Sequence, residues 1–347
     1  DAGHRVSLVR FGTMVEPFAP PIQLETFDAS QHAAVSTGIT NTVATAPIGN
    51  ATCYGAALDE CRIQLDDSDK RPRQIIHFFT DGKQNMAPWA EDILPMLISD
   101  GVEMHSTAFS AFDIFGGAST AILESMASQT GGSFAQVDAL PLDLRKRFLE
   151  VASVAMGLDA LLDPSYWESP QNPAKETFAV DPTAQTLAVV TAWAKPELEQ
   201  ARGQLTTPDG KTVDETWPGV QVLRREGHEM WKLDLRNLQS WGLRTEGLWT
   251  VVMQAGPKFR GRESMQVELM VYADTELDLR TEVANNPKYP DRITLLARML
   301  YKSQPVQQTR VRATWRFSQT DPKSPAQTKQ VYLYDDGKHG DGRANDG

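Results

Sequence analysis

The chain of 347 residues, with 41% hydrophobic and 23% charged residues, has the composition of a folded protein rather than a disordered one, and its length predicts two or three domains. Its net charge of -11 argues against nucleic acid as a partner, because phosphate recognition needs clustered Lys and Arg. The sequence contains no run of 18 apolar residues, so we expect no membrane-spanning helix within it.

Residues 1–158 alternate between strand-like and helix-like segments, which is typical of a parallel sheet covered by helices. The expected strands are residues 5–12, 74–79, 102–110 and 133–140. The expected helices are residues 52–65, 88–101, 120–132 and 141–157. Cys53 and Cys61 would lie about 12 Å apart on the first of these helices, which is too far for a disulfide. We therefore predict an α/β doubly wound domain.

Residues 159–176 are rich in Pro, Ser and Asn and are predicted to be a linker. After this segment the apolar residues recur with a period of two, which predicts the short strands of an all-β sandwich. The expected strands of the sandwich are residues 177–194, 203–215, 228–238, 247–256 and 264–274. More strands are expected at residues 276–283, 292–301 and 309–318 and from residue 331. Because about 70 residues are too few for a closed sandwich, we expect residues 275–347 to be part of a third domain.

Asp81 follows directly after the apolar strand expected at residues 74–79. In a doubly wound sheet, ligands bind at the carboxyl ends of the strands. A carboxylate followed by Gly82 suits a hard divalent cation, although the same two residues also suit an ordinary turn. Thr52 lies in a Gly-flanked loop before a helix, where its hydroxyl would either cap the helix or approach the same cation.

The order of these segments resembles a von Willebrand factor type A (vWA) domain over residues 1–158. The resemblance rests on the ordered motifs RVSLVRFG, GNATCYGAAL, IIHFFTDG, LISDGVEMHSTAFS and MASQTGGSFAQV. It implies that Thr52 and Asp81 are two ligands of a metal-ion-dependent adhesion site. In such a site Mg²⁺, or Mn²⁺ or Ca²⁺, keeps one coordination position for a carboxylate from a partner protein.

The sequence departs from the family in the DxSxS motif, which would supply the other three ligands. The most similar stretch, DASQH, contains Asp28 and Ser30 but follows an alternating segment, and we interpret it as a loop or a helix start. The N-terminus has no signal-peptide pattern, and we expect the chain to begin within the domain, without its first strand. Weak metal binding and weak folding would follow, because a gap in a parallel sheet leaves backbone groups unpaired.

Beyond residue 158 the order of domains looks like that of extracellular proteins related to the calcium-activated chloride channel regulators (CLCA). In that group a vWA domain precedes a β-rich domain and a domain like fibronectin type III, which here would be truncated. This resemblance implies an extracellular, cell-surface or periplasmic location. The stretch YLYDDGKHGDGRANDG is similar to an Asp- and Gly-rich hairpin of the third domain and does not fit an EF-hand. Its acidic residues would either bind Ca²⁺ or form turns between strands, and they are Asp335, Asp336, Asp341 and Asp346.

Other motifs give no further site. His228 lies in GHEMWKL, which lacks the second His of a zinc protease motif, so we expect an ordinary strand residue. No phosphate-binding Gly loop and no G-x-S-x-G motif is present. Asn50 begins an N-x-T sequon that overlaps the loop of Thr52, and we expect it to be unmodified if the cation site is used. Six tryptophans are expected in the sandwich core, namely Trp193, Trp217, Trp231, Trp241, Trp249 and Trp315.

These observations favour a noncatalytic, cation-dependent protein-binding module of a cell-surface or secreted protein. The partner would be a protein that supplies a carboxylate. Two alternatives stay open. One is the regulatory part of a CLCA-like metalloprotease whose active site lies upstream, and the other is a structural spacer with a degenerate metal site.

Overall fold

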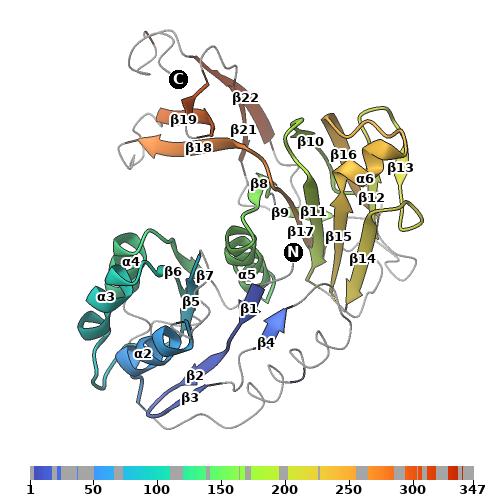
Figure 1. Ribbon diagram of the computed structural model, residues 1–347. Coiled ribbons are helices and arrows are strands. Elements are labelled where there is room, and N and C mark those ends of the chain that lie inside the picture. Colours follow the sequence, from blue (N-terminus) through green and yellow to red (C-terminus); the bar gives the residue numbers. More distant parts are fainter. Residues whose placement is uncertain are drawn as a thin grey trace. The chain divides into compact units, whose positions relative to one another are not determined.

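The computed structural model forms two compact units, Asp1–Ala155 and Met156–Gly347, which are described separately (Figure 1). The described residues are 4–17, 22–24, 37, 51–65, 73–109, 120–137, 141–163, 165–168, 173–194, 202–225, 227–254, 265–284, 294–302, 304–306, 311–317, 327–334 and 338.

The first unit contains a three-stranded parallel sheet in the order β5-β6-β7. Its strands are β5 (Ile75–Thr80), β6 (Glu103–Phe109) and β7 (Phe134–Val137). Its helices are α2 (Tyr54–Leu65), α3 (Ala90–Ser99), α4 (Thr120–Gln129) and α5 (Pro141–Ala155). Each of these seven elements lies where the sequence pattern predicts it, so the alternation of strands and helices between residues 52 and 155 is confirmed.

The two faces of this sheet carry different kinds of side chain. Helices α2, α3 and α4 pack on one face and share an apolar core with Phe78 and Met104. On the other face α5 places Phe148 against His77, with ring centroids 4.7 Å apart, and Arg147 against Thr107. One face is therefore an ordinary hydrophobic core, whereas the other contains buried polar groups.

The N-terminal strands do not follow the prediction. Residues 5–12 were expected to form one strand but are divided between β1 (His4–Val6) and β2 (Val9–Phe11). Strand β1 pairs antiparallel with β4 (Ile22–Leu24), and β2 forms a hairpin with β3 (Val15–Pro17) because the chain turns at residues 12–14. Among the described residues β5 pairs only with β6. Phe11 nevertheless stacks on Phe78 of β5, with centroids 5.0 Å apart.

The second unit contains two antiparallel sheets. The four-stranded sheet has the order β10-β16-β12-β13, formed by β10 (Lys175–Val180), β16 (Gly247–Gln254), β12 (Arg202–Thr206) and β13 (Thr212–Val213). The other has the order β14-β15-β11-β17-β8 with β9 also on β17, formed by β14 (Val220–Arg225), β15 (His228–Asp234), β11 (Thr186–Trp193), β17 (Met265–Ala273), β8 (Asp159–Leu162) and β9 (Ser165–Glu168). Side chains of both sheets, including Trp249 and Trp231, belong to one core.

Four expectations for this unit need correction. The strand expected over residues 203–215 is a hairpin of β12 and β13, because the chain turns at residues 207–210. The predicted linker, residues 159–176, contains β8 and β9, which pair with β17 and therefore belong to the folded unit. The strand expected over residues 177–194 is two strands, because a turn at Asp181 separates β10 from β11. The strand expected over residues 228–238 ends at Asp234, whose carboxylate accepts a hydrogen bond from the Asn237 N–H at 3.0 Å and caps helix α6 (Leu235–Ser240).

The remaining described strands form two smaller sheets. One has the order β18-β19-β20, formed by β18 (Leu277–Ala284), β19 (Thr294–Tyr301) and β20 (Gln304–Pro305). The other is β21 (Val311–Phe317) paired with β22 (Gln327–Leu333). The likeness to fibronectin type III stays a prediction. None of the helices in the described ranges is both long enough and apolar enough to cross a bilayer.

The tryptophans expected in the core have different environments. Trp193, Trp231 and Trp249 are buried. Trp217 is half-buried and packs at the edge of the core. The prediction for Trp241 is wrong, because it follows α6 at the surface and its side chain is 62% exposed. The side chain of Trp315 lies outside the described part of the structure.

Candidate functional site

Thr52 and the Asp81-Gly82 turn meet at the carboxyl end of β5. Asp81 is the first residue after this strand, and Thr52 lies two residues before α2. A Cβ atom placed on Gly82 would lie 3.2 Å from the Thr52 hydroxyl oxygen. Two loops that are separated by about thirty positions in the sequence are therefore in contact.

Backbone hydrogen bonds hold the loop of Thr52 against its neighbours. The Thr52 N–H donates to the Asn85 side-chain oxygen at 2.7 Å, and the Asn85 N–H donates to the Thr52 carbonyl at 3.0 Å. The next residue, Cys53, donates its N–H to the Gly12 carbonyl at 3.1 Å. The Gly55 N–H donates to the Pro88 carbonyl at 3.1 Å. The loop is thus fixed from both sides, and the position of the Thr52 side chain is defined by the fold.

The buried side chain of Tyr54 holds the Asp81-Gly82 turn in place. Its side chain is fully buried, and its hydroxyl donates a short hydrogen bond to the Gly82 carbonyl. The Thr80 hydroxyl interacts with the same residue, accepting from the Gly82 N–H at 3.3 Å. Burial raises the pKa of the Tyr54 phenol, the hydrogen bond with Thr80 lowers it, and the negative charge of Asp81 raises it. Tyr54 therefore remains a neutral donor that fixes the backbone beside Asp81.

Two oxygen-bearing side chains at this rim, those of Thr52 and Asp81, form no side-chain hydrogen bond or ion pair with described residues. The Thr52 hydroxyl forms no hydrogen bond with a described residue, so the helix-capping interpretation finds no support among the described contacts. The exposed Asp81 carboxylate forms neither a hydrogen bond nor an ion pair within the described ranges. A hydroxyl and a carboxylate are the hard ligands that Mg²⁺ and Ca²⁺ prefer.

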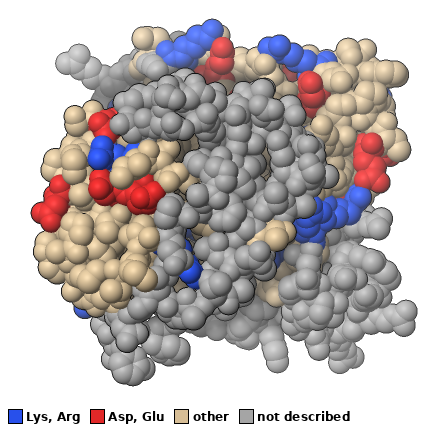
Figure 2. All heavy atoms as spheres, turned by 60° about the horizontal axis from the view of Figure 1, so that its bottom comes forward, with Lys and Arg blue, Asp and Glu red and all other residues tan. Residues whose placement is uncertain are grey.

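Several other acidic side chains on the surface form ion pairs with basic neighbours. Figure 2 shows one face on which described Asp and Glu side chains lie in mixed groups with Lys and Arg. Ion pairs include Arg62 with Asp59 at 3.0 Å in the first unit and Lys211 with Asp209 at 3.3 Å in the second. Asp81 has no such ion pair among the described residues, and the same is true of the exposed Glu124 on α4. No group of three or more His, Cys, Asp or Glu residues among the described ones is arranged to hold a metal ion.

The other predicted site residues are not brought to this rim. Asp28, Ser30 and Asn50 lie outside the described residues, as do the acidic residues of the C-terminal hairpin, Asp335, Asp336, Asp341 and Asp346. His228 is the first residue of β15, in agreement with its interpretation as a strand residue.

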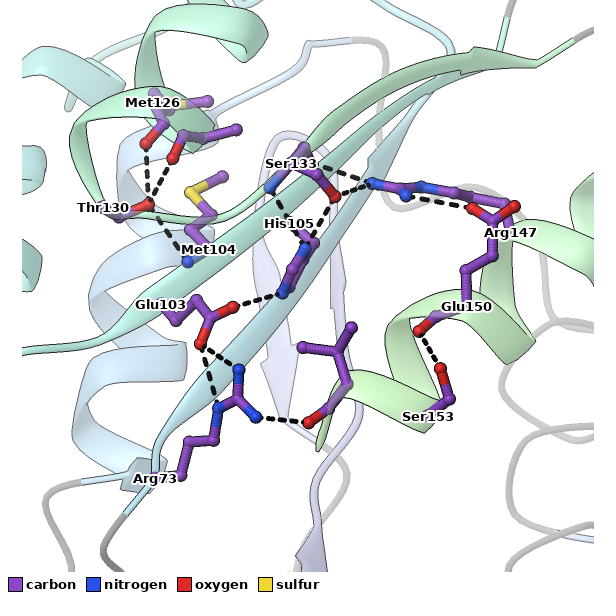
Figure 3. Close-up of polar contacts among 12 residues, drawn as sticks. Arg73, Glu103, Met104, His105, Met126, Thr130, Ser133, Arg147, Glu150 and Ser153 are labelled. Carbon is purple, nitrogen blue, oxygen red and sulfur yellow. Dashed lines mark hydrogen bonds and ion pairs between the residues drawn. The ribbon is translucent and has the colours of Figure 1, made fainter. Parts of the chain in front are cut away.

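Sequence reasoning missed a second polar cluster at the opposite end of the sheet. Arg147 of α5 donates to the Thr107 hydroxyl of β6 and to Ser133. Ser133 in turn contacts the imidazole of His105 (Figure 3). The only sequence signal is the polar alternation in the strand EMHSTAF, which also suits a strand with one solvated face.

Comparisons with known proteins give distant structural matches only. No protein-family model matches the sequence, and no curated protein matches it. A von Willebrand factor type A protein from Catenulispora acidiphila is 11% identical with a TM-score of 0.38, over 79% of this chain and 54% of that one. Human COPII-coat protein Sec24c is 10% identical with a TM-score of 0.32, over 78% of this chain and 37% of that one.

A third structure is an uncharacterized membrane spanning protein from Vibrio fischeri. It is 17% identical with a TM-score of 0.22, over 44% of this chain and 77% of that one. The chain spans about half the length of the Catenulispora protein. At these scores the matches do not place the chain in a family, so the functional argument depends on the residues themselves.

Proposed function

We propose that the first unit is a protein-binding module that uses a divalent cation at the rim formed by Thr52 and Asp81. Mg²⁺ is the favoured ion, with Mn²⁺ and Ca²⁺ as alternatives. The partner would be a protein that presents a carboxylate. At this rim no covalent bond is made or broken.

The observation that carries this proposal is the contact of the Thr52 side chain with Gly82, next to a carboxylate without a described partner. The residues fit a weak Mg²⁺ site, because Mg²⁺ is commonly held by one or two carboxylates and keeps several waters. Thr52 and Asp81 would hold the ion, and Tyr54 would keep the turn in place through Gly82. A bound ion would offer a coordination position to an acidic side chain of the partner.

The location that fits this function is the cell exterior, where a vWA-type module followed by β-rich domains would act in adhesion. This inference rests on the order of segments in the sequence, including the CLCA-like order of domains.

Titration of the purified chain with Mn²⁺, followed by calorimetry and by water-proton relaxation, tests the cation site. We expect Asp81→Asn and Thr52→Val each to lower the affinity at least tenfold, which corresponds to about 1.4 kcal/mol. Glu124→Gln is a matched control, because Glu124 is an exposed acid on a different element, α4, and is not one of the proposed ligands. Equal Mn²⁺ binding by the wild type, Asp81→Asn and Glu124→Gln would refute the site. No binding by any of them would favour the structural spacer.

A further inference from the structure

The side chains of Ser133, His105 and Glu103 are connected in series at the amino ends of β6 and β7 (Figure 3). Asp81 follows the carboxyl end of the parallel strand β5, which is the opposite end of the sheet. The Ser133 hydroxyl oxygen lies 2.9 Å from Nδ1 of His105. Nε2 of the same ring lies 3.0 Å from Oε1 of Glu103. A hydroxyl, an imidazole and a carboxylate are thus joined in the order that activates a serine nucleophile.

The hydrogen bonds determine which nitrogen of His105 carries the proton. The Ser133 backbone N–H donates to Nδ1 at 3.2 Å, so Nδ1 is an acceptor. The proton of the neutral ring is therefore on Nε2, from which it is donated to Glu103. Because Nδ1 is an acceptor, the Ser133 hydroxyl donates its own proton to it. The Nδ1 lone pair is consequently shared by the backbone N–H and the hydroxyl of Ser133, with the hydroxyl at the shorter distance.

Two arginines hold the side chains of Glu103 and Ser133 in place. Arg73 binds Oε2 of Glu103 through Nε at 3.0 Å and Nη2 at 2.8 Å, which leaves Oε1 for His105. Arg147 donates from Nη2 to the Ser133 hydroxyl oxygen at 2.8 Å and to the Ser133 carbonyl at 2.9 Å. A guanidinium in this position stabilises negative charge that develops on the serine oxygen.

The protonation state of His105 is suited to a base. Burial lowers the pKa of His105, and Arg147 and Arg73 lower it as well, while Glu103 acts in the opposite direction. The net direction is downward, so the ring is neutral at pH 7.

The exposure of Ser133 to solvent distinguishes this network from one that only supplies hydrogen bonds to buried polar groups. His105 is 3% exposed and Arg147 is 7% exposed, whereas Ser133 is exposed. Gly131, two residues before Ser133, has open space around it, since an added Cβ atom would meet nothing within 4 Å, whereas Gly132 between them is packed against Met104. The reactive oxygen therefore belongs to a residue at the surface, and its supporting groups are inside.

We propose that Ser133 is a nucleophile for acyl transfer from small carboxylic esters, with His105 as its general base. In the first step Oγ of Ser133 forms a bond to the acyl carbon while its proton moves to Nδ1 of His105. The bond from the acyl carbon to the alcohol oxygen then breaks, and the proton passes from Nδ1 to that oxygen. Water, deprotonated by His105, attacks the acyl-serine and releases the carboxylic acid and Ser133.

Glu103 and Arg73 are positioning residues in this reaction. Glu103 keeps the Nε2–H tautomer and stabilises the imidazolium that forms, and Arg73 holds Glu103 in place. This activity is separate from the cation-dependent binding proposed above, because the two sites lie at opposite ends of the strands.

Reaction of the intact chain with a fluorophosphonate probe tests the proposal directly. The serine oxygen would displace fluoride from phosphorus, and the adduct would be located by peptide mass spectrometry. We expect labelling of Ser133 in the wild type, none in Ser133→Ala, and a rate at least about 100-fold lower in His105→Gln. Glu103→Gln should slow labelling while Ser133 itself is kept.

Ser128→Ala is the matched control, because the Ser128 hydroxyl on α4 donates only to a carbonyl, that of Ser125, at 3.1 Å. Its labelling and its hydrolysis of p-nitrophenyl acetate should equal those of the wild type. Thermal unfolding and circular dichroism of each variant would separate loss of reactivity from loss of fold. Locating the fluorophosphonate adduct in the wild-type chain does not depend on the folding of any variant. Failure to find the adduct on Ser133 would therefore overturn the proposal. A rate that is unchanged in folded His105→Gln would do so as well.

Discussion

The hydroxyl of Thr52 lies directly against Gly82, so closely that a methyl group on residue 82 would sit 3.2 Å from it. This contact connects the loop before α2 with the turn that presents Asp81. Any group added there has to move one of the two proposed cation ligands.

Gly82→Ala is therefore expected to weaken Mn²⁺ binding several-fold. A contact of 3.2 Å requires a shift of a few tenths of an ångström, so the free energy of unfolding should fall by no more than about 1 kcal/mol. Calorimetric titration and urea unfolding of the same preparations would measure the two effects. A variant with wild-type affinity would show that the relative position of the two loops does not matter for the cation.

Gly132→Ala should disturb the fold much more than Gly131→Ala. A Cβ on Gly132 would lie 2.0 Å from the Met104 carbonyl oxygen, so the backbone of β6 or β7 must move. We expect a loss of about 3 kcal/mol or more in the free energy of unfolding. Gly131 has open space around it but a φ of +80°, which costs an alanine about 1 to 2 kcal/mol. Urea unfolding of both variants gives the comparison, and the reverse order would contradict the packing described for this loop.

Much of the first unit could be predicted because its signals are local. The strand IIHFFT is a continuous apolar run, and the residues after it, Asp81 and Gly82, mark its end. The Thr52 loop was found for the same reason, since it lies between glycines directly before a helix. The order of segments in the sequence could suggest that the two loops converge. The hydrogen bond from the Tyr54 hydroxyl to the Gly82 carbonyl is seen only in the structure.

The polar cluster at the other end of the sheet could not be predicted, because its members come from four different elements. Glu103 and Arg147 look like ordinary surface residues in the sequence, yet Arg147 is buried against β6. The split of residues 5–12 was missed for a related reason: pairing partners at residues 15–17 and 22–24, rather than apolar pattern, decide where each strand ends. Such pairings are tertiary and leave no periodic signal.

Trp249 and Trp241 illustrate the same limit and give a matched pair of substitutions. Trp249 is fully buried, and its indole N–H donates to the Thr245 carbonyl at 2.7 Å. Trp249→Phe leaves that carbonyl unpaired and opens a small cavity, so we expect a loss of about 1 to 3 kcal/mol in the free energy of unfolding. Trp241→Phe, at an exposed position, should change it by less than about 0.5 kcal/mol. Similar losses in chemical unfolding of both variants would contradict the burial of Trp249.

The half-buried His77 should make the first unit sensitive to acid. Burial, the positive charge of Arg147 and the neighbouring His105 together lower its pKa from 6.5 to about 4, with burial as the largest cause. Since the unfolded chain then binds a proton more readily than the folded one, this contribution to stability is fully present above pH 6.5. It is lost as the pH falls from 6.5 to about 4, and the loss is on the order of 3 kcal/mol.

The free energy of unfolding of the first unit would be measured by urea unfolding of the intact chain at pH 7 and at pH 5. His77→Gln removes the titrating group while keeping a side chain that can hydrogen-bond the Thr107 hydroxyl, which lies 2.9 Å from His77 Nε2. We expect its stability to fall less between these pH values than that of the wild type. Glu103, Arg147 and His105 remain in the variant, so any residual slope reports on them. Identical slopes in both proteins would show that His77 is not protonated on unfolding in this range.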